Sequence, residues 1–314
     1  MKRIALLFPG QGSQSTGMGK DLYDAFPPVR ELYEEASEIL KVDIAALSFE
    51  GPEERLRQTR FTQPAILVHS LSVLAILEEE GLEATAAAGH SLGEYTALRA
   101  AGALGTPTAI DLVRQRALLM QQAGEERPGT MAAIIGLPRN AVETICREAG
   151  SRGPVQPANF NCPGQIVVSG AVAAVHEAIH LAQAAGASKA VELTVGGAFH
   201  SVLMEGAAAG LAEVLQDIDI SPARIPVISN VSAEPVTEPD DIRSGLARQI
   251  THPVLWEDSM ARLLKENIDL FIEIGPGKVL KGLLRRIDKE AEVICLGDVS
   301  GLEEFLTKRS SWEN

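Results

Sequence analysis

The segment Gly89-His90-Ser91-Leu92-Gly93 limits the folds open to this chain more than any other stretch. Gly-x-Ser-x-Gly is the spacing that places a serine on a sharp turn between a strand and a helix, because the glycines remove side chains that would clash. Residues 94–101 are compatible with a helix, whose free N–H groups would face a developing oxyanion. Ser91 is therefore our candidate nucleophile. A chance match in a loop of a Gly- and Ala-rich chain stays open as the alternative.

Composition and charge indicate an ordinary globular protein. The length of 314 residues predicts about two domains. The chain has 28 Lys and Arg against 42 Asp and Glu, a net charge of −14, which disfavours a nucleic-acid-binding or membrane-binding surface. The three cysteines lack paired spacing, which argues against a zinc ribbon or a disulfide framework. No apolar run of signal-peptide or transmembrane length is found, so we expect a cytoplasmic protein, by default a monomer.

The order of predicted strands and helices indicates an α/β core. A strand at 4–8 precedes helices around 28–40 and 64–80, and a further helix is opened by Thr106 as N-cap with Pro107 behind it. The remaining core elements are expected as helices near 204–216, 239–250 and 256–266, strands at 225–230 and 270–274, and a final helix from about Lys278.

Residues 130–195 follow a different order, β-α-β-β-α-β, which is typical of a ferredoxin-like unit. Such a unit inside an α/β core makes the core discontinuous. We therefore predict a catalytic core of residues 1–125 and 197–314 with an inserted subdomain of residues 126–196.

Two partial motif matches are rejected. Gly12 to Gly17 has the glycine spacing of a phosphate-binding loop, but Met18 stands where such a loop needs Lys. His176 and His180 match the His-Glu-x-x-His zinc signature, but no third ligand follows and the predicted helix lies in the insert. We expect His176 and His180 on a solvated helix face.

Arg116 is predicted to project from the buried face of its helix, because it lies in the middle of an apolar arc that includes Leu112 and Met120, whereas Arg114 points elsewhere. A buried guanidinium is costly unless an anion meets it, and this arc supplies no acid. A structural ion pair with a distant acid and a bidentate site for a substrate carboxylate are both open.

His200 is the best-placed candidate base among six histidines. It lies in the small-residue loop 196–201 that leaves the predicted insert, from which a side chain can reach a cleft between the two domains. A purely structural histidine is the alternative.

Seven ordered motifs then carry a resemblance over nearly the whole chain. They are Phe8-Pro9-Gly10-Gln11-Gly12-Ser13-Gln14, Thr62-Gln63-Pro64-Ala65, Gly89-His90-Ser91-Leu92-Gly93-Glu94, Arg114-Gln115-Arg116, Asn159-Phe160-Asn161-Cys162-Pro163-Gly164-Gln165, Ala198-Phe199-His200-Ser201 and Glu273-Ile274-Gly275-Pro276-Gly277. With these motifs the chain closely resembles malonyl-CoA:acyl-carrier-protein transacylases. The resemblance implies an α/β-hydrolase-like core with an inserted ferredoxin-like (βαββαβ) subdomain.

The resemblance also implies a ping-pong acyl transfer through a malonyl-Ser91 intermediate, with His200 as general base and acid. The group that orients the histidine maps onto Gln249, an amide or carbonyl in place of a carboxylate. The oxyanion hole maps onto the N–H groups of Gln11 and Leu92.

Substrate selection would rest on Arg116, which the resemblance pairs with the malonyl carboxylate. Gln63, Met120 and Asn161 are expected to line or flank the pocket, and Phe199 resembles the bulky residue that favours malonyl over methylmalonyl. No cofactor or metal is expected, because coenzyme A thioester and phosphopantetheine enter as substrates.

A basic stripe provides a candidate docking surface for the acyl carrier protein, which the resemblance implies to be acidic. Lys278, Lys281, Arg285 and Lys289 recur at i, i+3, i+7 and i+11 of the predicted final helix. An ordinary solvated helix face is the alternative.

Three classes of function remain at this stage. The first is the transferase, supplying fatty acid synthesis or serving a polyketide synthase. The second is a serine hydrolase or thioesterase built on the same turn, which would have no reason to bury Arg116. The third is a non-catalytic carrier-protein-binding module, against which the combination of Ser91, His200 and Arg116 argues.

Overall fold

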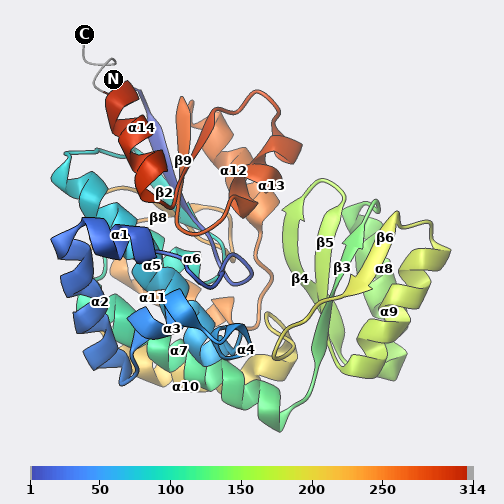
Figure 1. The fold of residues 1–314 in the computed structure, drawn as a ribbon. Coiled ribbons are helices and arrows are strands. Elements are labelled where there is room, and N and C mark those ends of the chain that lie inside the picture. Colours follow the sequence, from blue (N-terminus) through green and yellow to red (C-terminus); the bar gives the residue numbers. More distant parts are fainter. Residues whose placement is uncertain (1, 310–314) are drawn as a thin grey trace.

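The computed structural model describes residues 2–309, and its strands form two separate sheets (Figure 1). The larger sheet has the strand order β10-β9-β1-β2-β7-β8 and the smaller sheet the order β4-β5-β3-β6. The strands of the larger sheet are β1 (Ile4–Phe8), β2 (Ala86–Gly89), β7 (Val227–Ile228), β8 (Pro235–Val236), β9 (Leu270–Ile274) and β10 (Val293–Leu296). The strands of the smaller sheet are β3 (Thr130–Ile135), β4 (Val155–Cys162), β5 (Gln165–Gly170) and β6 (Lys189–Glu192).

The larger sheet is buried on both faces. Its neighbouring strands are parallel except for the pair β7 and β8. Leu6 and Phe8 of β1 belong to one apolar cluster, whereas Ala5 and Leu7 belong to another on the opposite face, as the alternation of side chains along a strand requires. The carboxyl ends of β1, β2, β7 and β9 meet at one edge, which is where open α/β sheets bind ligands.

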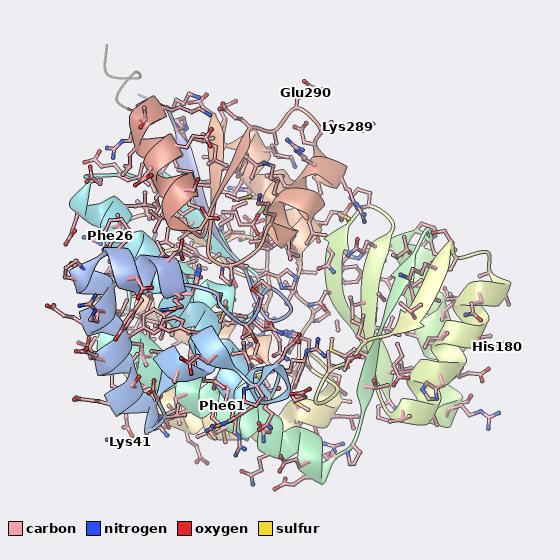
Figure 2. All side chains as sticks on the ribbon, in the orientation of Figure 1. Phe26, Lys41, Phe61, His180, Lys289 and Glu290 are labelled. Carbon is pink, nitrogen blue, oxygen red and sulfur yellow. The ribbon has the colours of Figure 1, made fainter. Side chains whose placement is uncertain are left out.

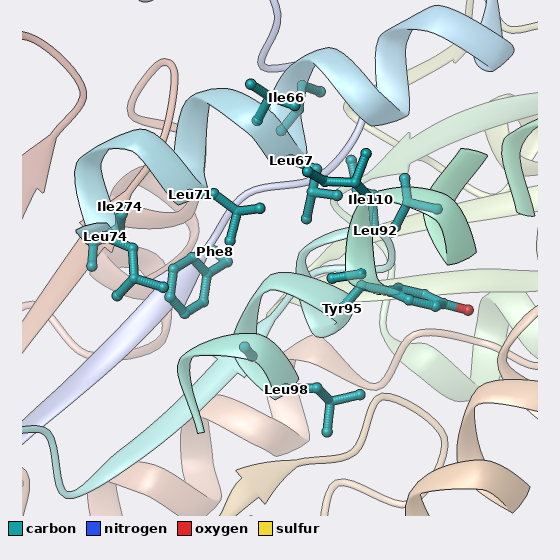
Figure 3. Close-up of a cluster of buried hydrophobic side chains, with 14 of the residues drawn as sticks. Phe8, Ile66, Leu67, Leu71, Leu74, Leu92, Tyr95, Leu98, Ile110 and Ile274 are labelled. Atoms are coloured by element: carbon teal, nitrogen blue, oxygen red, sulfur yellow. The ribbon is translucent and has the colours of Figure 1, made fainter. Parts of the chain in front are cut away.

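Helices cover both faces of this sheet. One face packs against α5 (Thr59–Glu79) and α6 (Gly93–Ala100), and Figure 3 shows Phe8 among side chains of these two helices. Helix α7 (Thr106–Glu126) packs against α5 and α6. The other face packs against α12 (Trp256–Lys265) and α13 (Val279–Ile287). The remaining core helices are α1 (Lys20–Ala25), α2 (Pro27–Leu40), α3 (Ile44–Glu50), α4 (Glu53–Leu56), α10 (Glu205–Gln216), α11 (Pro239–Gln249) and α14 (Val299–Arg309).

The smaller sheet is antiparallel, and α8 (Arg139–Ala149) and α9 (Val172–Ala184) complete its β-α-β-β-α-β order. Figure 1 shows both helices on the side of this sheet that faces away from the larger part. The predicted fold class, an α/β core with an inserted ferredoxin-like unit, is confirmed. The boundaries at residues 126 and 196 stay a prediction.

Several element predictions are wrong in detail. The N-cap of α7 is Gly105, so Thr106 is the first helical residue. The helix from Lys278 is not the final element, because β10 and α14 follow it. That helix ends at Ile287, so Lys289, the last member of the predicted basic stripe, lies beyond the helix. The sequence reasoning also missed α1, α3, α4 and β8, which are short, and it made β7 too long.

Helix α5 corrects the expectation that no apolar run has transmembrane length. By length and composition it could cross a membrane, but 83% of its most apolar window is buried inside the protein. Its buried face includes polar side chains such as Thr62, Gln63 and His69, which interrupt the apolar pattern in the sequence. In this structure α5 is the central helix of the core.

The turn after β2 depends on the absence of a side chain at Gly93. A Cβ atom there would lie 2.0 Å from the main-chain oxygen of Phe8. We expect Gly93→Ala to lower the free energy of unfolding by about 2 kcal/mol or more, because the neighbour is rigid backbone. Gly282→Ala is the matched control, since nothing lies within 4 Å of its added Cβ in helix α13. That control should gain on the order of 0.5–1 kcal/mol. Urea unfolding of both variants checks this, and equal effects would contradict it.

Candidate active site

Ser91 stands on a tight turn between β2 and α6. Its φ is 51°, in the left-handed region that a residue with a side chain adopts only when its surroundings impose it. A Cβ on Gly89 would lie 1.9 Å from the main-chain carbon of Gly93, so only glycine allows the turn to close. Two side-chain amides hold the serine main chain: Ser91 N donates to Asn230 Oδ1 at 2.7 Å, and Gln249 Nε2 donates to Ser91 O at 2.9 Å.

His200 reaches Ser91 from the loop that follows β6, although the two residues are far apart in sequence. Ser91 Oγ lies 2.8 Å from His200 Nε2, and His200 Nδ1 lies 2.8 Å from the main-chain oxygen of Gln249. A carbonyl only accepts, so Nδ1 carries the proton and Nε2 is free to accept one. Burial, and after it the Arg116 charge, lower the pKa of His200 to about 3, although the hydrogen bond to the main chain of Gln249 opposes the change. The imidazole is therefore neutral and can act as a base.

Arg116 projects into the same site from α7 and is completely buried, whereas Arg114 pairs at the surface with Asp111. Its Nη1 donates to Gln63 Oε1 at 2.6 Å, and its Nη2 donates to Gln249 Oε1 at 2.8 Å and to Ser91 Oγ at 3.0 Å. Its guanidinium carbon lies 5.2 Å from the ring centre of Tyr95. The described part of the chain offers it no carboxylate within ion-pair distance. Burial lowers its pKa, opposed by Tyr95 and Glu94, and the Nε group has no hydrogen-bond partner within residues 2–309.

A cavity of about 120 Å³ opens beside these three side chains. Its walls are mostly apolar, with a few polar groups converging on one side, as in many small-molecule sites. The lining residues are Gln11, Gln63, His90, Ser91, Leu92, Arg116, Met120, Met131, Asn159, Leu193, Val195, Phe199 and His200. The structure therefore brings most of the predicted site residues together.

Two predicted site residues lie outside the cavity lining. Asn161 of β4 lies behind the turn that carries Ser91: its Oδ1 is 2.9 Å from Nε2 of His90. Asn159, two residues earlier in the same strand, lines the cavity. Gln249 lies behind Ser91 and Arg116.

The main-chain N–H groups of Gln11 and Leu92 are available to an anion. Both residues line the cavity, one from the loop after β1 and the other directly after Ser91. Within residues 2–309 neither N–H donates to another residue. Two free N–H groups on either side of a nucleophile are suited to bind an oxyanion.

Comparison with known proteins now identifies the family. The acyl transferase domain family matches residues 5–300. The chain is 46% identical over 304 residues to the malonyl CoA-acyl carrier protein transacylase of Bacillus subtilis (strain 168), covering 96% of each protein. The chain belongs to the acyl transferase domain family.

Solved structures agree with this acyl transferase over nearly its whole length. An acyl carrier protein S-malonyltransferase from Vibrio cholerae is 42% identical with a TM-score of 0.93, covering 96% of this chain and 99% of that one. A malonyl-transacylase in complex with a type II PKS acyl-carrier protein is 40% identical with a TM-score of 0.94, covering 98% of this chain and 99% of that one.

The sequence reasoning missed two residues that support this acyl transferase site. Asn230, after β7, binds the main chain of Ser91, and its Nδ2 donates to Gly89 O at 2.7 Å. Glu94 is only 3% exposed in the first turn of α6, and burial raises its pKa to about 7 against hydrogen bonds from Gln249 and Asn230. A signal for Glu94 was present, because it is a carboxylate in a helix whose other positions are mostly small or apolar.

No cluster of three or more His, Cys, Asp or Glu within residues 2–309 is arranged to hold a metal. His176 and His180 are both exposed on α9, and His176 lies 3.1 Å from Glu192 across the subdomain surface. Figure 2 shows His180 on the outer side of the smaller part.

The buried neutral His200 should make the fold sensitive to acid. An unfolded histidine takes up a proton below pH 6.5, whereas the folded His200 stays neutral until about pH 3, so stability is lost as the pH falls through this window. Between pH 7 and 4.5 the free energy of unfolding should fall by about 3 kcal/mol more for wild type than for His200→Gln, at about 1.36 kcal/mol per pH unit below the unfolded pKa. Urea unfolding at both pH values measures this. Burial also lowers the pKa of His69 and of His90, but both residues are present in both proteins, so their contributions cancel. Equal losses would contradict the prediction.

Proposed function

We propose that this acyl transferase moves malonyl from malonyl-CoA to the phosphopantetheine thiol of an acyl carrier protein, through a malonyl ester of Ser91. One observation carries the proposal: Ser91 Oγ lies between the neutral His200 and a buried Arg116 that no carboxylate within residues 2–309 contacts. A nucleophile next to an unmatched guanidinium fits an acyl group that brings its own carboxylate.

In the first half-reaction His200 Nε2 takes the proton from Ser91 Oγ as the oxygen attacks the thioester carbonyl carbon. The N–H groups of Gln11 and Leu92 donate to the oxyanion that forms. When the carbon–sulfur bond breaks, His200 returns the proton to the sulfur of coenzyme A. In the second half the carrier thiol gives its proton to His200 and attacks the ester, and Ser91 Oγ recovers the proton.

Arg116 selects the acyl group in this proposal, with Gln63 and Gln249 fixing the orientation of its guanidinium. Leaving a buried cation unmatched costs several kcal/mol, which is enough to disfavour acetyl by orders of magnitude. Met120 and Phe199 limit the size of the cavity, and Phe199 favours malonyl over methylmalonyl. Asn161 acts from behind, through His90.

A serine hydrolase is the second candidate, and the hydrogen-bond partner of His200 argues against it. Its Nδ1 meets a main-chain carbonyl of Gln249 and not a carboxylate, so imidazolium is stabilised less than in a Ser-His-Asp triad. We propose fatty acid synthesis as the pathway, with a polyketide synthase as the alternative. The alternative is supported by the related malonyl-transacylase that was solved in complex with a type II PKS acyl-carrier protein. We further propose a cytoplasmic monomer that needs neither metal nor cofactor.

Intact-protein mass after brief incubation with malonyl-CoA or acetyl-CoA tests this function. We expect one malonyl adduct on wild type, discharged by carrier protein and absent from Ser91→Ala. Acetyl-CoA should leave wild type unlabelled, and Arg116→Ala should lose most of the preference for malonyl because the carboxylate has no partner. Steady release of coenzyme A without carrier protein would favour the hydrolase. Neither adduct nor release would favour a binding module.

We also propose that the carrier protein docks on the basic face of α13. Lys278 and Arg285 are exposed there, and Lys281 is partly exposed. A Cβ on Gly277 would lie 3.6 Å from the main-chain oxygen of Ser13, so this face begins next to the loop that carries Gln11. Lys289 lies beyond the helix, and Figure 2 shows it at the outer end of the same part. Opposite charges on an acidic partner would steer docking.

Reversing two charges on this face should weaken docking without affecting loading. We expect Lys281→Glu with Arg285→Glu to raise the KM for carrier protein about tenfold, equivalent to about 1.4 kcal/mol. Loading from malonyl-CoA should not change. Arg30→Glu with Lys41→Glu is the matched control on and beside α2, and Figure 2 shows Lys41 far from Lys289. An equal KM for both double variants would contradict docking on α13.

A further inference from the structure

Glu94 is a buried carboxylate for which the reaction described above has no use. It lies in the first turn of α6, three residues after Ser91, and is 3% exposed. Its two oxygens have separate partners: Oε1 accepts from the main-chain N of Asn230 at 3.2 Å, and Oε2 accepts from Nε2 of Gln249 at 2.5 Å. Glu94 does not touch the cavity.

The two partners of Glu94 are the residues that hold the main chain of Ser91. Asn230 Oδ1 accepts from Ser91 N at 2.7 Å, and Gln249 Nε2 donates to Ser91 O at 2.9 Å. The other end of the Gln249 amide, Oε1, accepts from Arg116 Nη2 at 2.8 Å. Because Oε2 of Glu94 requires a donor, it fixes which end of this amide faces the guanidinium.

We propose that Glu94 is a positioning residue of this site: its carboxylate orients Gln249 and Asn230, and through them the strained Ser91 turn and the Arg116 guanidinium. The inference rests on the roles proposed above for Ser91 and Arg116. Glu94 acts only through other residues and does not meet the substrate.

The chemistry of the two contacts requires an ionised carboxylate. The N–H groups that face Glu94 come from Asn230, in the loop after β7, and from Gln249 at the end of α11, and both are donors. The Ser229 hydroxyl also hydrogen-bonds the carboxylate and can donate to it. Both oxygens of Glu94 therefore accept. A glutamine side chain, or a protonated carboxyl, places a hydrogen against one of these donors and leaves that contact unsatisfied. If the Gln249 amide turns over to compensate, its NH₂ group faces Arg116.

The charged and titratable groups around Glu94 set its response to pH. Arg116 from α7 is the nearby cation, Tyr95 is its neighbour on α6, and His200 lies beyond Gln249. Burial raises the pKa of Glu94 to about 7, although its hydrogen bonds and Arg116 oppose the change. Protonation in this range removes one acceptor from the network. The rate of loading should therefore fall as the pH drops below about 7, while His200, with a pKa of about 3, remains neutral.

Rates of malonyl-Ser91 formation across about pH 5.5 to 8.5 test this role. We expect Glu94→Gln to fold and to lower kcat/KM for malonyl-CoA at least tenfold at pH 8. Its pH profile should lack the decline near pH 7. Glu94→Asp, which keeps two acceptor oxygens, should recover part of the rate together with the decline. Glu273→Gln is the matched control: this buried carboxylate also accepts from two N–H groups, here both main-chain, but at the start of α13. The control should keep the wild-type loading rate and pH profile.

The outcomes separate this inference from the proposed function. A wild-type rate that does not change between pH 5.5 and 8.5 overturns the role of Glu94, even if no variant folds. A Glu94→Gln variant that is loaded at the wild-type rate with the wild-type pH profile also overturns the role of Glu94. A wild type that forms no adduct on Ser91 overturns the proposed function itself, and the role of Glu94 with it.

Discussion

The buried guanidinium of Arg116 is the constraint on which the rest of the site depends. A cation without solvent and without a contacting carboxylate is costly, because amide oxygens orient a guanidinium without cancelling its charge. Three neutral groups, on Gln63, Ser91 and Gln249, accept its hydrogen bonds. The same charge helps to keep His200 neutral. The Arg116 guanidinium therefore both favours the basic form of His200 and favours a substrate that carries a negative charge.

Gln249 connects these requirements because its main chain and side chain do different work. The main-chain oxygen fixes the tautomer of His200, while the two ends of the amide meet Arg116 on one side and Ser91 and Glu94 on the other. A carboxylate in this place would form a direct ion pair with Arg116. The amide leaves the guanidinium free to bind an anion from solution, and the negative charge of Glu94 stays one residue further away.

The local parts of this arrangement could be predicted from the sequence, and the long-range parts could not. The glycines around Ser91 report a backbone constraint that acts within five residues, and the burial of Arg116 follows from the register of one helix. By contrast, the contacts of Asn230 and Glu94 join segments that only the parallel sheet brings together. The role of Gln249 was predicted from the family resemblance, and the spacing of residues in the sequence does not indicate it. The sequence reasoning placed the last element at α13, and the structure adds β10 and α14 after it.

Both the proposed nucleophile and the proposed base are held in a strained main-chain conformation. Ser91 and His200 both have φ values in the left-handed region, at 51° and 58°, and each such residue costs on the order of 1–3 kcal/mol. A single fully buried Leu or Phe contributes a comparable 1.5–3 kcal/mol, and the two clusters that flank the larger sheet contain many such side chains. The core can therefore hold two strained residues and an unmatched cation within one small cavity. The same features placed in a smaller protein would consume most of its net stability, which is commonly only about 5–15 kcal/mol.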